Sequence, residues 1–167
     1  MSSAVVYYSL EGNTRLAATE LAERLGADLY EVRSEKKYPR KGLGQFLSGG
    51  KDAMFGALPK IEPLDVDLTT YDLVVLAFPL WAGKAAAPIN TFLEGRKFGN
   101  ARVAMVVCSA SGDGGSCAKD LSARIGRSEG DIAELDLQQP SKMAKADLSA
   151  KLDGFAKRIE TRAGGAF

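Results

Sequence analysis

The stretch AVVYYSLEGNTRLAATELAERLG, residues 4–26, contains a strand pattern, a short turn and a helix pattern in direct succession. Residues 4–8 are apolar and β-forming, whereas residues 13–25 carry apolar side chains at helical spacing and end at Gly26, a frequent helix stop. The turn between them, SLEGNT at residues 9–14, supplies two hydroxyls, a glycine, an asparagine and one carboxylate. A strand that enters a helix through so short a turn is the first half of a βαβ unit. The stretch therefore predicts an α/β fold.

The remaining sequence repeats this alternation of strand and helix patterns. Strands are predicted at residues 27–32, 72–78, 102–108 and 132–137, and helices near residues 42–56 and at residues 85–95, 115–125 and 145–162. Two of the strand patterns are apolar throughout, as in strands that helices cover on both faces. The order predicts a single domain over residues 1–167, with a parallel sheet, right-handed crossovers and helices on both faces.

The composition is that of a globular protein. Hydrophobic residues make up 46% of the chain and charged residues 26%, and 22 Lys and Arg stand against 21 Asp and Glu. This balance argues against a dedicated nucleic-acid binder or a binder of anionic membranes, which carries a basic excess. No apolar run approaches the roughly 20 residues that span a bilayer, and the N-terminus lacks the pattern of a secretory signal. A cytoplasmic protein is therefore expected, with neither a nucleic acid nor a membrane as its partner.

The absence of histidine restricts the chemistry. It excludes Ser-His-Asp and Cys-His catalysis, histidine-ligated metals and imidazole acid–base chemistry. Cys108 and Cys117 match no metal-ligand spacing, so we interpret them as reduced thiols in preference to a disulfide or a redox pair. No catalytic residue and no metal ligand is assigned, and a bound cofactor is expected to supply any reactive centre.

Three loops of similar composition follow the first, third and fourth predicted strands. They read SLEGNT at residues 9–14, PLWAGKAAAP at residues 79–88 and SASGDGGSC at residues 109–117. In a doubly wound sheet, ligands bind beyond the carboxyl ends of the strands, where the strand order reverses, and these loops should meet there. They consist mostly of small residues, so their backbone amides are accessible, and Trp81 is their one large aromatic side chain. The loops are therefore the candidate ligand site.

The first of these loops has the composition of an anion-binding nest. Ser9 and Thr14 offer hydroxyls and Asn13 offers an amide. Gly12 permits a tight turn, and the following helix adds its free N–H groups. The loop contains no Lys or Arg, so it suits a phosphate held mainly by neutral donors. A plain strand-to-helix turn with Asn13 or Ser9 as the N-cap is an equally good interpretation of this loop alone.

Two common nucleotide-binding motifs are absent. No GxGxxG follows the first strand, which excludes the dinucleotide fingerprint. The segment GQFLSGGKD, residues 44–52, has one residue too many between its glycines for a P-loop, and Asp52 stands where a P-loop has Ser or Thr. A phosphate in the first loop would therefore be bound in another manner.

The three loops and their strands resemble the flavodoxin family. YYSLEGNT at residues 7–14 is similar to the family's FMN-phosphate loop, whose usual form is hydroxyl-x-Thr-Gly-x-Thr. YDLVVLAFPLWAG at residues 71–83 resembles its third strand and the loop that contacts the isoalloxazine ring, and VVCSASGDGG at residues 106–115 resembles its fourth strand and second flavin loop. The resemblance covers nearly the whole chain and implies a flavodoxin-like, doubly wound, five-stranded parallel sheet in the order 2-1-3-4-5, with FMN as the cofactor.

The resemblance implies three groups of FMN-binding residues. The group expected to hold the phosphate is Ser9, Leu10, Glu11, Gly12, Asn13 and Thr14. The group expected to line one face of the ring and its N5 edge is Pro79, Leu80, Trp81, Ala82, Gly83 and Lys84. The group expected at the pyrimidine end is Ser109, Ala110, Ser111, Gly112, Asp113, Gly114 and Gly115.

Three of these residues receive more specific roles. Trp81 would stack on or beside the ring, with a tryptophan of the core or surface as the alternative. Gly83 would let the peptide next to N5 change orientation between redox states, because glycine imposes little conformational preference. Asp113 would tune the reduction potential, with a solvated loop aspartate as the alternative.

The sequence departs from the family pattern in three respects. Glu11 stands where the family more often has threonine, and residues 109–115 lack the aromatic side chain that commonly covers the outer face of the ring. The chain is also near-neutral, whereas electron-shuttling flavodoxins are acidic. Because a phosphate dianion would repel a carboxylate, we expect Glu11 to turn outward and to donate only its backbone N–H. Tyr38, Phe46, Phe55 or a partner chain could cover the open face.

These departures leave more than one function open. The first hypothesis is an FMN-binding electron-transfer protein that exchanges electrons with a redox partner protein. The second is an NAD(P)H-dependent FMN or quinone oxidoreductase, because a ring with one open face admits a second planar molecule. Flavodoxin-like oxidoreductases are often homo-oligomers whose neighbouring subunit completes the site, so a homodimer is a possible assembly. The third is a domain of the same fold that has no flavin and acts as a binding or regulatory module.

Overall fold

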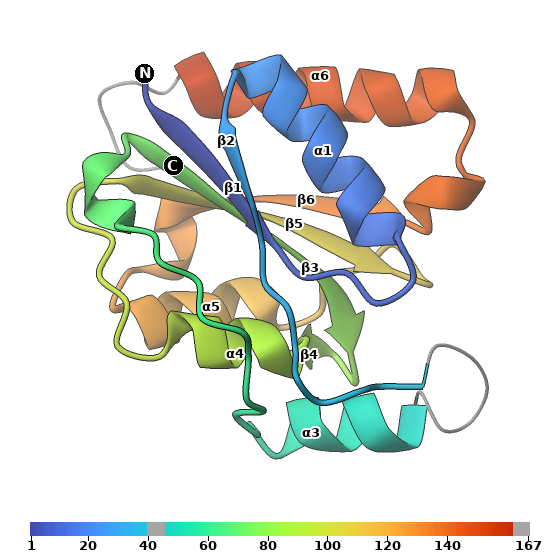
Figure 1. Ribbon diagram of the computed structural model, residues 1–167. Helices are drawn as coiled ribbons and strands as arrows, with labels where there is room; N and C mark the ends of the chain where they lie inside the picture. The colour runs from blue at the N-terminus through green and yellow to red at the C-terminus, as the bar shows by residue number, and fades with distance from the viewer. Residues whose placement is uncertain (40–45, 162–167) are drawn as a thin grey trace.

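The computed structural model describes residues 1–39 and 46–161. In this part of the chain, five parallel strands form the main sheet in the order β2-β1-β3-β5-β6 (Figure 1). The strands are β1 (Ser3–Tyr7), β2 (Asp28–Glu31), β3 (Leu73–Trp81), β5 (Arg102–Ser109) and β6 (Ile132–Gln138). With β5 and β6 as the fourth and fifth strands, this order confirms the predicted order 2-1-3-4-5.

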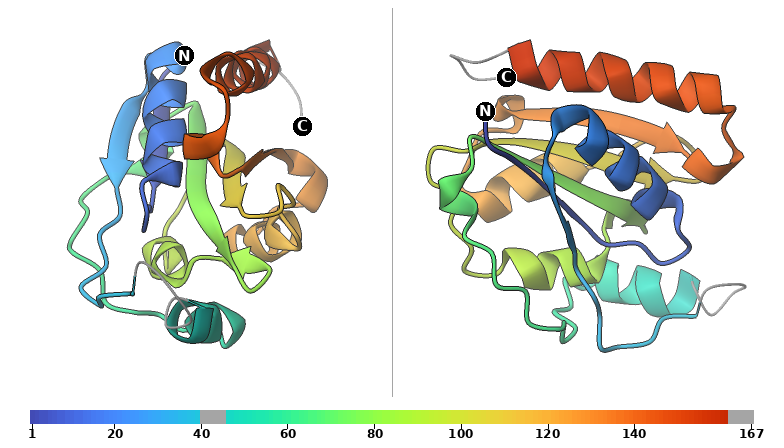
Figure 2. Two further views of the ribbon diagram at one scale, coloured as in Figure 1. Left: turned by 90° about the vertical axis from the view of Figure 1, so that its right-hand side faces the viewer. Right: turned by 45° about the horizontal axis from the view of Figure 1, so that its top comes forward.

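Helices cover both faces of this sheet, as the alternating sequence pattern predicts (Figure 2). Helices α1 (Asn13–Leu25) and α6 (Lys145–Thr161) cover one face, and helices α4 (Ala87–Leu93) and α5 (Cys117–Ile125) cover the other. Helix α1 has the predicted bounds, and Gly26 ends it in the left-handed conformation with φ 57°. Helix α6 ends at Thr161 in the structure, and residue 162 of the predicted helix lies outside the described residues.

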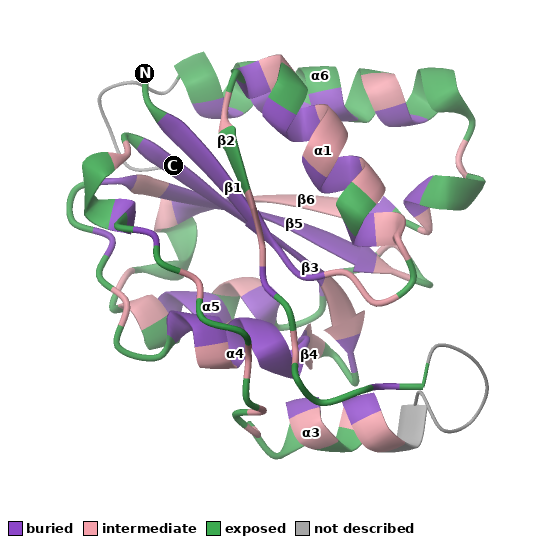
Figure 3. Ribbon diagram, viewed as in Figure 1, coloured by how far each residue is buried: buried purple, intermediate pink, exposed green. Residues whose placement is uncertain are grey.

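The strand register sorts the apolar side chains into two core layers. Val5, Val75, Ala104 and Ala133 lie in one row across the sheet and belong to the core layer under α1 and α6. Their neighbours along each strand point to the opposite face and belong to the layer that α4 and α5 cover. Because both layers are buried, the central strands are buried along their length (Figure 3). This explains why their sequences are apolar without alternation.

The segment between β2 and β3 contains the predicted helix near residues 42–56, of which residues 42–45 lie outside the described part. The rest forms a π-helical turn, η1 (Phe46–Gly50), that continues into the short helix α3 (Lys51–Met54). Helix α3 lies beyond α4 on the side away from the sheet (Figures 1 and 2). Short 3-10 turns, η2 (Leu68–Thr70), η3 (Glu129–Asp131) and η4 (Pro140–Lys142), complete the described elements.

The prediction of a loop at residues 79–88 is wrong in its first half. Strand β3 continues to Trp81 and turns back into β4 (Lys84–Ala85), so that Leu80 pairs with Ala85 and Trp81 with Lys84 in an antiparallel hairpin. The physical reason is burial, because the extension carries the Trp81 ring into the core layer under α4 and leaves it only 8% exposed. No helix in the described residues is long and apolar enough to cross a membrane.

Candidate functional site

The first loop connects β1 to α1 at the point where the strand order reverses. The hydroxyl Oγ of Ser9 accepts a hydrogen bond from the N–H of Gly12 at 3.1 Å. Gly12 then takes φ 99°, a value that favours glycine, and occupies the N-cap position of α1. No side chain in the described residues caps this helix, so the N–H groups of its first turn are available to an anion. The alternative in which Ser9 or Asn13 is the N-cap is therefore wrong.

Two side chains of the first loop are engaged inside the protein. The Oδ1 atom of Asn13 accepts a hydrogen bond from the N–H of Ser141 at 2.9 Å. Thr14 is 1% exposed, and its side chain forms a hydrogen bond with the thiol of Cys108. The hydroxyl of Thr14 is therefore engaged inside the protein, whereas Asn13 uses only its acceptor oxygen and keeps its NH2 donors beside the backbone N–H groups of the loop.

Glu11 lies on the outside of the first loop. Its side chain is exposed and makes no hydrogen bond or ion pair with a described residue. This exposure places no internal contact on the Glu11 carboxylate, and its expected orientation away from a bound phosphate stays a prediction. The backbone of the loop remains open to an anion, because no carboxylate in the loop is drawn into it by a hydrogen bond.

The tip of the β3–β4 hairpin consists of Ala82 and Gly83, which have φ 49° and 77°. Positive φ at both central positions is typical of the tight hairpin turn that matches the twist of the strands. Gly83 adopts it without strain, whereas the left-handed region disfavours Ala82 by about 1 kcal/mol. The turn thus carries a flexible glycine next to a strained alanine, at the place where the sequence predicts contact with a flavin ring.

Lys84 points away from this turn and toward α5. Its Nζ donates a hydrogen bond to Oδ2 of Asp120 at 2.8 Å, and Oγ of Ser116 donates to the same oxygen at 3.0 Å. Partial burial disfavours the charged carboxylate of Asp120, but these two hydrogen bonds outweigh that effect and hold its pKa below the usual range. Lys84 is therefore already paired, and its charge is not directed at the loops.

Trp81 belongs to a buried aromatic cluster. Its ring meets that of Tyr8 edge to face, with centroids 5.6 Å apart, and that of Tyr38 at 4.8 Å. Gly49 packs directly on the indole, since a Cβ there would lie 3.2 Å from it. The structure thus gives Trp81 a packing role, and its contact with a flavin stays a prediction.

Of the three residues named as possible covers of the open ring face, Tyr38 and Phe55 differ in burial. Tyr38 is buried, and its hydroxyl donates to Oδ2 of Asp52 at 2.8 Å, which together with burial raises the pKa of the phenol. Phe55 is 75% exposed just after α3. The side chain of Phe46, the third residue named, lies outside the described side chains.

The third loop follows β5 and folds on its own hydrogen bonds. Oγ of Ser109 accepts from the N–H groups of Gly112 at 2.8 Å and of Asp113 at 3.2 Å. The carboxylate of Asp113 accepts in turn from the N–H of Gly115 at 2.8 Å. Asp113 is therefore a structural member of the loop, and its effect on a reduction potential stays a prediction.

The second and third loops touch each other. Oγ of Ser116 donates to the carbonyl of Gly83 at 3.3 Å, and a Cβ on Gly115 would lie 3.0 Å from the same carbonyl oxygen. This close approach explains why the third loop carries glycine at residue 115. The tip of the hairpin and the end of the third loop thus form one continuous surface.

The segment after β6 joins the first loop to the third, and it is absent from the predicted site. Nε2 of Gln138 donates to the carbonyl of Ala110 at 2.9 Å, while the N–H of Ser141 donates to Asn13. Gln139 has φ 42°, a strained value for a residue with a side chain. The mostly polar residues 138–142 at the end of the last strand could have indicated this contribution to the site. The carboxyl ends of all the parallel strands lie at the same edge of the sheet.

Two carboxyl groups on β6 lie beneath the third loop. A Cβ on Gly114 would meet Glu134 and Asp136, so the bare backbone of the loop packs on both. Burial and then repulsion by the Asp136 carboxylate raise the pKa of Glu134 to about 7. This pair therefore takes up a proton near neutrality.

Cys108 and Cys117 are free and buried. Burial raises the pKa of each thiol to about 12, so both are protonated near neutral pH. The interpretation of these residues as reduced thiols is confirmed.

The strand order defines a doubly wound α/β protein with a flavodoxin-like fold, and the loops after β1, β3 and β5 follow the carboxyl ends of its central strands. The family model described as flavodoxin matches residues 2–151. The chain therefore belongs to the flavodoxin family. No curated protein sequence matches it.

Solved structures share this fold over nearly their whole length. A protein described as a flavoprotein from Bacteroides eggerthii is 25% identical, with 93% of this chain and 98% of that chain covered and a TM-score of 0.70. A flavoprotein from Lactobacillus acidophilus, solved in complex with FMN, is 23% identical over 84% of this chain and 95% of that chain, with a TM-score of 0.65. A flavodoxin from Streptococcus pneumoniae is 15% identical, with 98% and 100% covered and a TM-score of 0.59.

Proposed function

We propose that this protein binds FMN and uses the flavin to transfer electrons. The observation that carries the proposal is the N-terminus of α1, whose first-turn N–H groups lack a side-chain cap and follow the Ser9–Gly12 turn at the switch point of the sheet. Membership of the flavodoxin family supports the choice of FMN, and so does the FMN complex of the Lactobacillus acidophilus neighbour.

The residues at the three loops fit this cofactor. The first loop offers backbone donors to a phosphate, while Glu11 lies outside and Asn13 and Ser141 hold the loop in place. The hairpin turn at Ala82–Gly83 and the third loop offer small side chains and a backbone that a planar ring can approach closely. Flavin, when bound, supplies the redox chemistry, and the protein supplies hydrogen bonds, contacts and local dielectric.

The chain's own residues would therefore orient the cofactor and exclude water from one side of it. The backbone N–H groups of α1 would fix the phosphate end. The carbonyl of Gly83 accepts a hydrogen bond from Ser116, so reorientation of that peptide would require the loss of one bond between the second and third loops. The hairpin and the third loop are thus coupled at the position expected to face the ring.

The first experiment tests whether the purified protein carries flavin. We expect a yellow protein with the absorption bands of oxidised flavin, and FMN in the supernatant after denaturation. If the protein is isolated without flavin, titration with FMN under observation of flavin fluorescence should give saturable one-to-one binding. A colourless protein that also fails to bind added FMN would overturn the proposal and favour a flavin-free module.

The second experiment distinguishes an electron carrier from an NAD(P)H-dependent FMN or quinone oxidoreductase. The holoprotein is reduced anaerobically while its absorption spectrum is recorded. Reduction in two resolved one-electron steps, without bleaching by NAD(P)H, supports a carrier that serves a redox partner protein. Rapid bleaching by NAD(P)H in a single two-electron step, followed by reoxidation with a quinone, supports the oxidoreductase. Two features support this second function as the alternative to test. The chain is near-neutral, unlike the acidic electron carriers, and residues 109–115 contain no aromatic side chain to cover the ring.

A further inference from the structure

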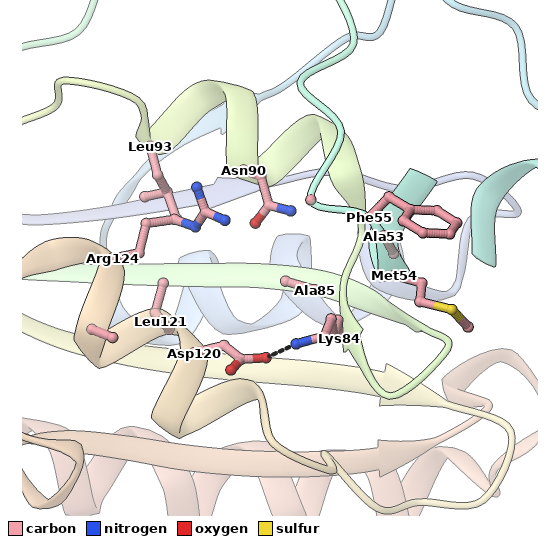
Figure 4. A pocket seen from close by; sticks show the side chains of 12 residues that line it. Ala53, Met54, Phe55, Lys84, Ala85, Asn90, Leu93, Asp120, Leu121 and Arg124 are labelled. Carbon is pink, nitrogen blue, oxygen red and sulfur yellow. Dashed lines mark hydrogen bonds and ion pairs between the residues drawn. The ribbon is translucent and has the colours of Figure 1, made fainter. Parts of the chain in front are cut away.

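A cavity of about 570 Å³ lies between α3, α4, α5 and the β3–β4 hairpin (Figure 4). It is separate from the first loop and takes its lining from residues 53–56, from Lys84 and Ala85, and from the inner sides of α4 and α5. A volume of this size accommodates a small organic molecule. None of residues 9–14 or 109–115 lines it, and of the predicted ring-contacting residues 79–84 only Lys84 does, whose charge is already paired with Asp120.

The cavity contains a buried amide that has no partner among the described residues. Asn90 on α4 is 7% exposed, and its side chain makes no hydrogen bond within that part of the chain. Figure 4 shows its carboxamide pointing into the cavity from the α4 side. Buried polar groups in native proteins are hydrogen-bonded to protein, to water or to a ligand, so this carboxamide has a free donor and a free acceptor for a molecule in the cavity.

The cation of Arg124 lines the same cavity. The guanidinium of Arg124 reaches from α5 toward the part of the cavity that Asn90 faces (Figure 4). Its nearest carboxylate is that of Glu94, at 3.8 Å between Nη1 and Oε2, which is too long for a hydrogen bond, and Glu94 itself is 64% exposed at its side chain. Arg124 thus retains N–H donors for a ligand.

The other charged groups of the cavity neutralise each other. Lys84 and Asp120 form an ion pair at 2.8 Å at the opposite side of the cavity (Figure 4). Asp120 also accepts a hydrogen bond from the hydroxyl of Ser116, which stabilises its carboxylate further. Arg124 is consequently the cation whose charge is least compensated, and an anion is the charge that the cavity favours.

The rest of the lining is apolar. Leu93 and Leu121 form the inner wall, while Met54 and Phe55 stand at the rim and are 60% and 75% exposed. Exposed large apolar side chains beside a cavity are suited to cover an apolar body, and a thioether next to an aromatic ring is a favourable contact for another ring. The cavity therefore combines an anion-binding end with an apolar end.

We propose that this cavity is a second ligand site, which binds a small carboxylic acid with an aromatic body. The carboxylate accepts two N–H groups from Arg124 and one from the Asn90 carboxamide, a geometry that suits a planar anion. The ring lies between Leu93, Leu121 and the rim residues Met54 and Phe55. Because Lys84 and Ala85 of β4 also line the cavity, the ligand touches the hairpin whose other side the proposed flavin would contact.

The test is a titration of the purified full-length chain with sodium benzoate at constant pH and ionic strength, followed by amide chemical shifts in ¹H–¹⁵N NMR spectra. We expect saturating shifts at Asn90, Leu93, Leu121 and Arg124, with a Kd on the order of 1 mM for so small a probe. Benzyl alcohol, which lacks the charge, and acetate, which lacks the ring, should each bind about tenfold more weakly or worse. Saturation with FMN beforehand should leave the binding in place, which separates this site from the proposed cofactor site.

Two variants and one control locate the ligand. Arg124→Gln and Asn90→Ala should each raise the Kd for benzoate by about tenfold or more, because each removes a hydrogen bond to the anion. Lys119→Gln removes the same charge from an exposed position of the same helix outside the cavity, and it should change the Kd by less than about twofold. Thermal unfolding of each variant checks that the fold is retained. If Asn90→Ala unfolds, Arg124→Gln still tests the site, because Arg124 is partly exposed and its replacement leaves the core intact.

Three outcomes would overturn the proposal. The first is the absence of saturable shifts with benzoate in the wild-type chain. The second is equal weakening by Lys119→Gln and Arg124→Gln, which would indicate a diffuse charge effect. The third is a set of shifts centred on residues 9–14, which would place the anion in the first loop.

Discussion

The first and third loops of the site begin with the same type of turn, but they differ in how the backbone N–H groups after that turn are satisfied. Ser9 accepts from the N–H of Gly12 at 3.1 Å, and Ser109 accepts from the N–H of Gly112 at 2.8 Å. Both glycines have positive φ, 99° and 77°. Each turn comes directly after a buried parallel strand. The chain therefore leaves the carboxyl ends of β1 and β5 through the same type of turn.

The two loops differ in the residues that come after this glycine. In the first loop, α1 begins at once, and the described residues provide no side-chain cap for its first turn. In the third loop, four more residues precede α5, and Asp113 and Ser109 accept three of the N–H groups of the loop. The first loop therefore keeps its donors for a ligand, and the third satisfies its donors internally. An anion is expected at the first loop and an uncharged, planar group at the third.

The largest expected effect comes from a negative charge in the first loop. Asn13→Asp keeps an Oδ1 acceptor for the N–H of Ser141, and a carboxylate in the first turn stabilises a helix by about 0.3–1 kcal/mol. The same carboxylate would repel the FMN phosphate by several kcal/mol at an effective dielectric constant of about 20. We expect the Kd for FMN, measured by flavin fluorescence, to rise by about 100-fold or more while the unfolding midpoint is unchanged or higher.

The matched control places the same charge in the third loop. Ser111 is exposed, and its hydroxyl accepts from the N–H of Asp113, a role that an aspartate retains. Ser111→Asp should raise the Kd for FMN by less than about tenfold, since no phosphate is expected beside it. Equal weakening by both variants would show that the two loops are electrostatically equivalent and that the phosphate assignment is wrong.

The second prediction concerns the two glycines. A Cβ at Gly112 would lie 3.1 Å from Cβ of Gln138, whereas a Cβ at Gly12 would meet nothing within 4 Å. Gly112→Ala therefore adds a steric conflict to the strain of positive φ, and it should reduce the free energy of unfolding by about 2 kcal/mol. Gly12→Ala carries the strain alone and should reduce it by about 1 kcal/mol. Urea unfolding of the flavin-free proteins measures both, and the reverse order would contradict the tighter packing of the third loop.

The sequence predicts the parts of this comparison that depend on local pattern. The helix at residues 13–25 follows from apolar periodicity and from Gly26, and the structure confirms it. This pattern is local, because it is contained in one element and its two ends. The strand order follows from the resemblance to the flavodoxin family, and the structure confirms it as well. The predicted loop at residues 79–88 fails, since Pro79 and a run of small residues conceal a strand that continues to Trp81.

The sequence does not predict which polar side chains the fold engages elsewhere. Asn13 bonds to Ser141 across 128 positions, and Lys84 pairs with Asp120 across 36. Both residues look like ligand donors when their loops are considered alone. Only the packing of distant elements shows that the acceptor oxygen of Asn13 and the charge of Lys84 are already engaged. The contribution of Gln138 and Ser141 to the site has the same origin.

The third prediction uses the acidic pair that lies under the third loop. Burial and the neighbouring Asp136 raise the pKa of Glu134 to about 7 from the value of 4.5 that an ordinary Glu has. The folded protein therefore binds this proton more tightly than the unfolded chain, and its stability should fall as the pH rises from about 4.5 to about 7. Glu134→Gln cannot ionise, so its melting temperature should fall less over this interval and exceed that of the wild type at pH above about 7.

The control for this prediction is Glu11→Gln in the first loop. This variant removes an exposed carboxylate and leaves Glu134 and Asp136 in place, so the decrease of the melting temperature between pH about 4.5 and about 7 should be retained. If Glu134→Gln also retains this decrease in full, the carboxyl pair does not bind its proton more tightly in the folded state. The third loop would then lack the pH response that distinguishes it from the first.

The smallest expected effect is that of Glu11→Thr on FMN binding. Because Glu11 is exposed and unpaired, its replacement removes no contact within the described part of the protein. The substitution takes away one negative charge near the phosphate, and the new hydroxyl can add a hydrogen bond to it. We expect the Kd for FMN to stay equal or to fall by up to about tenfold, with Glu11→Gln between the two proteins. A Kd that rises in both variants would show that the Glu11 carboxylate contributes to FMN binding. Its side chain would then make contacts in the FMN complex that it does not make in the free protein.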